Sequence, residues 1–166
     1  MRAPEVAGPD CRLARGYSLL EVLIALVVLS IGLLGLAGLQ HLSLQRNQSA
    51  YHRTVATLLA YDIADRMRAN RVALSSYVLS PPASSASAPQ DCESAACTPA
   101  QLAAFDLSRW LSEMGARLPA AKGEITQNGN EFTIKVLWDD TREGLTGTTC
   151  SGAATDMKCF KLVFQP

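Results

Sequence analysis

The sequence predicts an α+β protein in which a long N-terminal helix packs on a small antiparallel sheet, with a short second helix. Three observations favour this class: a long apolar segment that continues into an amphipathic helical pattern, a second helical pattern, and alternating apolar residues toward the C-terminus. At 166 residues the chain has room for one domain with an attached segment. Its formal net charge is zero, whereas nucleic-acid-binding proteins typically carry an excess of basic residues.

The apolar segment Tyr17–Leu39 is long enough to cross a bilayer, because 23 residues of helix span about 34 Å. Arg12 and Arg15 precede it, whereas the next Lys or Arg after it is Arg46. This bias predicts a cytoplasmic N-terminus and an exported remainder. The alternative is an ordinary secretory signal cleaved near Gly35–Ala37, although the apolar region would be unusually long for one.

Glu21 is a carboxylate inside this apolar segment. An ionisable group in a bilayer costs roughly 2.5–3.5 kcal/mol on insertion scales, so a role or a charge partner is expected for it. One interpretation is that the side chain only reaches up to the headgroups at the cytoplasmic end of the span.

The stretch RGYSLLE at Arg15–Glu21 resembles the processing signal of type IV pilins and secretion pseudopilins. In that signal a basic leader ends in glycine, an aromatic residue follows, and a glutamate is fifth in the mature chain. The resemblance implies that a prepilin peptidase cuts after Gly16, which removes the leader at residues 1–16, and that the new N-terminus at Tyr17 is methylated. Tyr17 stands where phenylalanine is usual, and the leader is longer than many.

The same resemblance supplies a second interpretation of Glu21. In this family the glutamate pairs with the terminal ammonium of a neighbouring subunit as subunits leave the membrane for a filament. Pairing would let two charges that are costly in apolar surroundings neutralise each other. Glu21 is therefore expected to act in assembly, and residues 17–40 are expected to form a transmembrane and filament-core helix.

A helical pattern continues beyond the membrane segment. Apolar residues recur at three- and four-residue spacing at Val55, Leu58, Leu59, Ile63 and Met67. Because no proline occurs before Pro81, we expect residues 41–79 to continue the helix into the exported domain, unbroken to about Tyr77. The Pro/Ser/Ala-rich stretch Ser80–Gln90 then predicts an exposed loop.

Residues 80–166 are expected to form an exported pilin-like head with a short helix. Thr98 predicts the N-cap, Pro99 the first turn, and Gln101 completes a capping box. The expected apolar face of this helix comprises Leu102, Phe105, Leu107, Trp110, Leu111 and Met114. Gly115–Pro119 should end it.

Strand signals fill the rest of the head. Asn128–Gly129 is the signal of a type I′ turn in a hairpin, and apolar residues alternate after it at Phe132, Ile134, Val136 and Trp138. The stretch Lys158–Pro166 predicts a last strand with Phe160, Leu162 and Phe164 on one face.

Cysteine usage agrees with export. Cys11 lies in the leader, which leaves an even number in the mature chain: Cys92, Cys97, Cys150 and Cys159. An even number in an oxidising compartment predicts disulfides, and four cysteines allow three pairings. We favour the local pairing of Cys92 with Cys97 and Cys150 with Cys159, which closes short loops. A structural zinc site is the alternative, but neither spacing is the two-residue kind.

The sequence offers no catalytic constellation, so we expect no enzyme activity, no cofactor and no metal. His41 and His52 are interpreted as isolated polar-face residues without a ligand partner at suitable spacing. Asp139, Asp140 and Glu143 leave a calcium loop as an alternative, although an acidic turn after a strand is usually only solvated.

Four stretches in the mature chain are similar to the PilV family of minor pilins, the type IV pilus modification proteins. They read LAYDIADRMRANR, CTPAQLAAFDLSRWL, LPAAKGEI and VLWDD. The resemblance implies a protein that joins other minor pilins at the bacterial inner membrane to prime pilus assembly, with its head in the periplasm and later on the pilus at the cell surface. Implied partners are the other minor pilins, the pilus fibre, prepilin peptidase, the inner-membrane assembly platform, a PilY-type tip adhesin, and membrane lipid before assembly. No direct nucleic-acid partner is expected.

Two other classes of protein share parts of this pattern. A minor pseudopilin of a type II secretion system would share the N-terminal motif. A membrane-anchored periplasmic enzyme or sensor would also be exported, but it would leave Gly16 and Glu21 unexplained.

Overall fold

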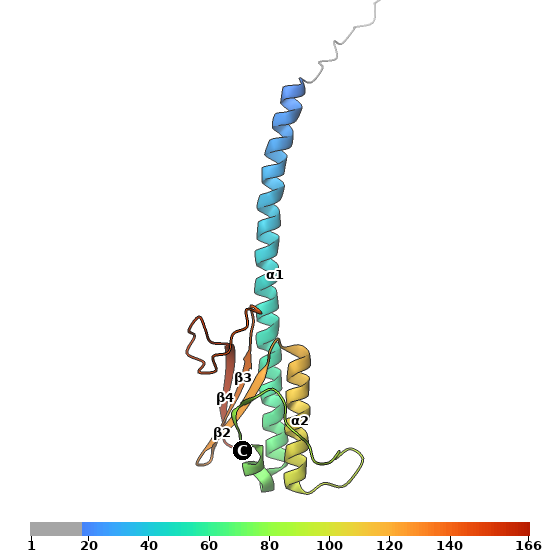
Figure 1. Ribbon diagram of the computed structural model, residues 1–166, viewed down its shortest axis with the longest axis vertical. Helices are drawn as coiled ribbons and strands as arrows, with labels where there is room; N and C mark the ends of the chain where they lie inside the picture. The colour runs from blue at the N-terminus through green and yellow to red at the C-terminus, as the bar shows by residue number, and fades with distance from the viewer. Residues whose placement is uncertain (1–17) are drawn as a thin grey trace, which may run out of the picture. The chain divides into compact units, whose positions relative to one another are not determined.

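The computed structural model describes residues 18–166, and these residues form the expected α+β fold. In chain order the elements are α1 (Leu19–Ala69), η1 (Arg71–Tyr77), β1 (Leu79–Ala83), α2 (Pro99–Arg117), β2 (Lys122–Asn128), β3 (Glu131–Trp138) and β4 (Lys158–Phe164) (Figure 1). The chain divides into two units whose boundary falls between Leu44 and Gln45, within α1.

In the first unit, α1 is apolar on all sides. Its large apolar residues from Leu19 to Leu44 are exposed, Leu19 to 78% and Leu34 to 74%. A window of this helix has a mean hydropathy of 2.8, so by length and composition it is able to cross a membrane. Such a surface requires a cover of lipid or of other helices.

In the second unit, α1 is amphipathic and buries one stripe against the rest of the head. The buried residues are His52, Val55, Ala56, Leu59, Ala60, Ile63, Ala64 and Met67. Leu58 was expected on this stripe, but it is 59% exposed, because it follows the i, i+7 spacing of Tyr51 on the opposite face. The remaining predicted stripe residues are buried.

The end of α1 differs from the sequence-based expectation. The α-helix stops at Ala69 instead of continuing to Tyr77, and residues Arg71–Tyr77 form the 3-10 helix η1. Asn70 leaves the helical region, with φ −113° and ψ 51°. Its side-chain amide donates to the Pro99 carbonyl at 2.8 Å, so a contact with a distant segment replaces continuation of the helix.

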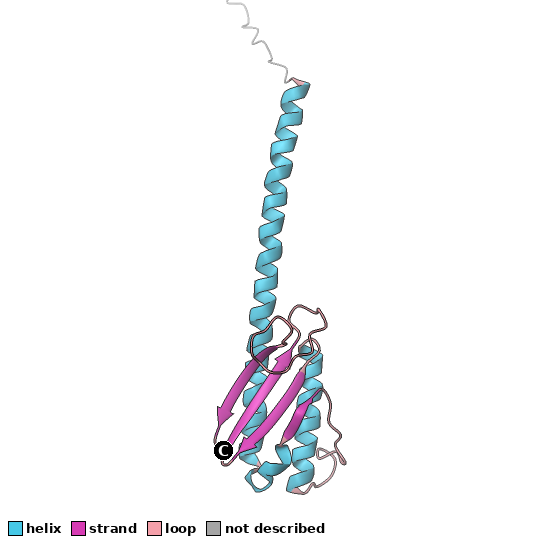
Figure 2. Cartoon of the chain, turned by 60° about the vertical axis from the view of Figure 1, so that its left-hand side comes forward, coloured by secondary structure: helices cyan, strands magenta, loops and turns pink. Residues whose placement is uncertain are grey.

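The four strands form one antiparallel sheet in the order β1-β2-β3-β4 (Figure 2). Strand β1 lies in the Pro/Ser/Ala-rich stretch that was expected to be a loop. It pairs with β2 through Leu79 opposite Ile125 and Ala83 opposite Gly123. Its two prolines are tolerated because β1 is an edge strand, where the missing N–H groups can face away from the ladder.

The predicted hairpin is formed by β2 and β3, but its turn differs by one residue. Asn128 pairs with Glu131, so the two-residue loop is Gly129–Asn130. Gly129 has φ 60°, whereas Asn130 does not have a positive φ. A type I′ turn needs positive φ at both positions, so this pattern instead fits type II′, which has glycine first.

Helix α2 begins as predicted, with a complete capping box between Thr98 and Gln101. Its buried face includes Trp110, whose indole N–H donates to the Leu59 carbonyl of α1 at 2.9 Å. Gly123 of β2 lies directly against the Trp110 ring, so even a methyl group at position 123 would collide with it. The core of the head is thus formed by side chains of α1, α2 and the sheet that pack together.

Candidate functional site

The candidate assembly site begins at the N-terminal end of α1. The Ser18 carbonyl accepts from the Glu21 backbone N–H at 3.0 Å, and the Ser18 hydroxyl accepts from the Leu20 N–H at 3.3 Å. Glu21 therefore lies in the first turn of the helix, where the positive end of the helix dipole favours a carboxylate. Its side chain is exposed.

The two processing residues, Gly16 and Tyr17, lie outside the described residues, and so does Cys11 in the leader. Cleavage after Gly16 and methylation at Tyr17 therefore stay predictions. What the structure adds is the element that follows them: an apolar helix starts at Leu19, two residues after Tyr17.

The head contains two local disulfides. Cys92 is bonded to Cys97 in the connection before α2, and Cys150 is bonded to Cys159 at the start of β4. The second bond ties the long β3–β4 connection back to the sheet. Inside that connection Asp156 accepts from the Thr149 hydroxyl at 2.5 Å and from the Ser151 N–H at 2.8 Å, and these bonds lower the pKa of Asp156.

His52 is not the isolated polar-face residue that the sequence suggested. It is only 4% exposed, and its Nδ1 lies 2.7 Å from Oδ1 of Asp140. Trp138 donates its indole N–H to the same oxygen at 3.1 Å. Burial alone would raise the pKa of Asp140, but hydrogen bonds from Ser49, His52 and Trp138 outweigh it and hold that pKa below its usual value.

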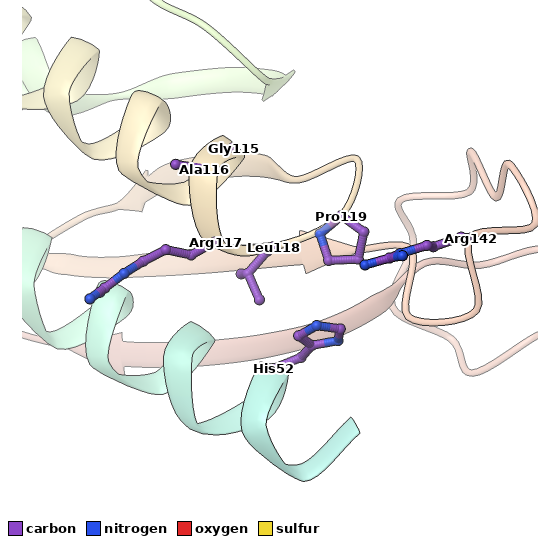
Figure 3. Close-up of a pocket in the computed structure, with 7 residues that line it drawn as sticks. All are labelled: His52, Gly115, Ala116, Arg117, Leu118, Pro119 and Arg142. Carbon is purple, nitrogen blue, oxygen red and sulfur yellow. The ribbon is translucent and has the colours of Figure 1, made fainter. Parts of the chain in front are cut away.

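A cavity of about 220 Å³ opens beside His52 (Figure 3). It is lined by the end of α2 and the two residues after it, together residues 115–119, and by His52 and Arg142. Figure 3 shows Arg142 extending toward Pro119 while Arg117 points away from it. This cavity contains none of the residues that the sequence singled out for processing, assembly or disulfide bonding.

In the acidic turn that was considered as a calcium loop, protein groups donate hydrogen bonds to the carboxylates of Asp139 and Asp140. Asp139 accepts from the backbone N–H groups of Gly144 at 2.7 Å and Leu145 at 3.2 Å. Burial acts to raise the pKa of Asp139, but these hydrogen bonds lower it overall. Asp140 is engaged by His52, and Glu143 is exposed. Within residues 18–166 no three potential ligands come together at a metal-binding spacing.

A buried polar network joins the end of α1 to α2. The Tyr77 hydroxyl donates to Oδ2 of Asp106 at 2.6 Å, and Arg66 donates to Oδ1 at 3.2 Å. Asn70 donates to the Tyr77 hydroxyl at 3.3 Å and to the Pro99 carbonyl. No local sequence signal predicts this network, because its members are up to 40 residues apart.

Comparison with known families agrees with the fold and the N-terminal helix. Residues 38–108 match the family model described as Type IV pilin Tt1218, and residues 11–37 match the model described as the prokaryotic N-terminal methylation motif. The second match contains Gly16, Tyr17 and Glu21. No curated protein and no solved structure gave a significant match.

The fold and the N-terminal motif together define a pilin-like protein, built on one long helix that carries a disulfide-bonded head. Over residues 38–108 the chain is similar to type IV pilins, and over residues 11–37 it carries the prokaryotic N-terminal methylation motif. The proteins it resembles there are structural proteins, and the similarity implies processing by prepilin peptidase and partners in a pilus. The apolar helix and the motif indicate anchoring in the inner membrane before incorporation into a pilus.

Proposed function

We propose that this protein is a minor pilin of the PilV kind, which joins other minor pilins at the inner membrane to prime pilus assembly and supports a PilY-type tip adhesin. The observation that carries the proposal is the apolar, exposed first unit of α1, which has Glu21 in its first turn and overlaps the methylation motif. The similarity of four stretches of the mature chain to the PilV family supports the minor role.

The proposed path begins with insertion. The N-terminus stays in the cytoplasm, where prepilin peptidase removes residues 1–16 and methylates Tyr17, while the head enters the periplasm. Two disulfides in the head suit that oxidising compartment. Lipid covers the apolar side chains of Leu19–Leu44 before assembly, and neighbouring helices replace it afterwards.

In our proposal Glu21 determines which helices can replace lipid around α1. Within residues 18–166 no cation lies within ion-pair distance of its carboxylate. A terminal ammonium at Tyr17 of a neighbouring subunit would neutralise it as both leave the headgroup region. A helix inserted without such a pair would keep an uncompensated charge in apolar surroundings, which is strongly destabilising.

The proposal is tested by deleting the gene and restoring it on a plasmid. Loss of surface pili on deletion, their return on complementation, and a small amount of the protein relative to the main subunit in sheared pili are the expected results. An amount equal to that of the main subunit would indicate a major pilin. Normal piliation combined with a defect in protein secretion would indicate a type II secretion pseudopilin instead.

A further inference from the structure

A cavity of about 230 Å³ lies in the head between α1 and the adjoining ends of β3 and β4. It is lined by Ser49, Arg53, Trp138, Lys158 and Cys159. Ser49 and Arg53 are four residues apart on α1 and therefore share one helix face. Trp138 and Lys158 are directly opposed in the β3–β4 ladder, so their side chains leave the same face of the sheet.

The lining carries two cations and no acid. Within residues 18–166 neither Arg53 nor Lys158 takes part in an ion pair. Asp140 contacts two of the lining residues, but it accepts hydrogen bonds from Ser49, His52 and Trp138. Two like charges that face one cavity repel each other, and an anion between them would remove that repulsion.

The cations are held by rigid elements. Arg53 lies in the middle of the continuous helix α1, and Lys158 opens strand β4 next to Cys159, whose disulfide to Cys150 fixes the start of that strand. The helix and the disulfide-anchored strand hold the backbone at both positions, while the exposed side chains of Arg53 and Lys158 become ordered when an anion binds.

We propose that this cavity binds a phosphate group. A phosphate monoester carries about −1.5 to −2 charges near neutral pH and three strong acceptor oxygens, which match one guanidinium fork and one ammonium approaching from different elements. A carboxylate would supply one charge and leave the second cation uncompensated. The same chemistry is offered by free phosphate and by the headgroup of an anionic phospholipid such as phosphatidic acid.

The cavity beside His52 is less suited to an anion, although it is also lined by arginines. Its wall is the C-terminal turn of α2, whose carbonyl groups form the negative end of the helix dipole. Arg117 also points away from Arg142 there (Figure 3). The phosphate site is therefore assigned to the Arg53–Lys158 cavity, and this assignment does not depend on the proposed role in pilus priming.

Trp138 lines the cavity and supplies a fluorescence signal for the test. The full chain in a non-ionic detergent is titrated with sodium phosphate near neutral pH, against sodium chloride at equal ionic strength. We expect a saturable change with phosphate that chloride does not produce. Arg53→Gln and Lys158→Gln should each weaken it about tenfold or more, because each removes a charge-assisted contact.

Two control variants separate binding from folding. Lys161→Gln removes an exposed cation from the same strand but outside the cavity lining, so it should bind as the wild type does. Lys158→Arg keeps the charge and should retain binding. The absence of a saturable response in the wild type, or an unchanged response in the Arg53→Gln/Lys158→Gln double variant, would overturn the proposal.

The source of the phosphate group is decided in nanodiscs of phosphatidylcholine with or without phosphatidic acid. If the site takes a lipid headgroup, added inorganic phosphate should change the fluorescence in phosphatidylcholine discs but not in discs that contain phosphatidic acid, where the site is already filled. A response of equal size in both kinds of disc would assign the site to free phosphate.

Discussion

Tyr77 donates a 2.6 Å hydrogen bond to the Asp106 carboxylate, and this contact fastens the 3-10 helix after α1 to the middle of α2. The Tyr77 side chain is fully buried, and Arg66 donates to the other oxygen of Asp106. Every buried side-chain polar atom in residues 18–166 has a hydrogen-bond partner. Removing one member of the network therefore leaves a buried polar group unsatisfied, which costs more than the bond itself contributes.

Tyr77→Phe should lower the free energy of unfolding of the head by about 1–3 kcal/mol, because Asp106 and Asn70 each lose a buried partner. The control is Tyr61→Phe, since Tyr61 is exposed on α1. Urea unfolding of the full chain in detergent, followed by tryptophan fluorescence, measures both variants. Equal midpoints for Tyr77→Phe and Tyr61→Phe would show that the network adds no stability.

Comparison of the wild type with Tyr77→Phe also measures how the contribution of Tyr77 to stability depends on pH. Burial first, and then the hydrogen bond to Asp106, raise the pKa of Tyr77 above its usual value. The folded state thus holds the phenol proton more tightly than the unfolded state does, so its stabilising contribution is complete below about pH 10 and is lost as the pH rises above that. The wild type should lose stability relative to Tyr77→Phe in that range.

Asp140→Asn is expected to destabilise the head by about 1–3 kcal/mol at neutral pH, because the residue would lose its charge-assisted bond to His52. The pKa of Asp140 is lowered in the folded state, so its contribution is present above about pH 4 and is lost as the pH falls through the folded value. The difference between wild type and variant should therefore shrink in acid. Glu143→Gln, at an exposed position of the same turn, is the control.

Sequence signals predicted those parts of the fold that depend on neighbours in the chain. The capping box of α2 and the β2–β3 hairpin are local patterns, and both are present. Strand β1 was missed because its prolines signal a loop, whereas pairing with β2 and an edge position make a strand there. The break at Asn70 depends on the Pro99 carbonyl, 29 residues away.

The functional residues also divide into those that a local motif predicts and those that only tertiary packing brings together. Gly16, Tyr17 and Glu21 form a contiguous motif that can be recognised from sequence alone. His52 was misread because its partner Asp140 is 88 residues distant, and no periodicity in α1 separates a buried histidine from a solvated one. The cavity between Arg53 and Lys158 has no sequence signature, since it is created by the packing of α1 on the start of β4.

The two disulfides should differ in their effect on stability. Cys150–Cys159 closes the longer loop and anchors the edge strand β4, while Cys92–Cys97 closes a five-residue separation in an exposed connection. We expect Cys150→Ser/Cys159→Ser to cost about 2–4 kcal/mol, and Cys92→Ser/Cys97→Ser to cost less. Unfolding with matched double variants measures this, and peptide mapping without reduction checks the pairing. Crossed pairs between the two loops would contradict it.

Processing at the N-terminus is predicted from the motif. The mature chain should begin at N-methylated Tyr17, and Gly16→Val should block maturation by crowding the peptidase subsite with a branched side chain. Intact mass and N-terminal sequencing of membrane protein give the answer, with Gly8→Val in the leader as a control that should be processed normally. A mature start near Gly38 would instead support an ordinary secretory signal.

Glu21 variants separate assembly from insertion. Glu21→Ala and Glu21→Gln should leave insertion and cleavage intact, because removing a charge eases residence in the membrane. Both should reduce the amount of protein in the pilus, since the terminal ammonium of the neighbouring subunit would lose its counter-charge. Glu21→Asp should be intermediate, because the charge remains but its reach is shorter by one methylene.

The measurement compares processed protein in the inner membrane with the same protein in sheared pili for each variant. Ser30→Ala, within the same exposed helix, is a matched control, because the Ser30 hydroxyl donates only to the Leu26 carbonyl of its own helix at 2.7 Å. It should reach the pilus in wild-type amounts. If Glu21→Ala did so too, with normal piliation, the carboxylate would serve only to contact the headgroups, and pairing between subunits would be ruled out as its role.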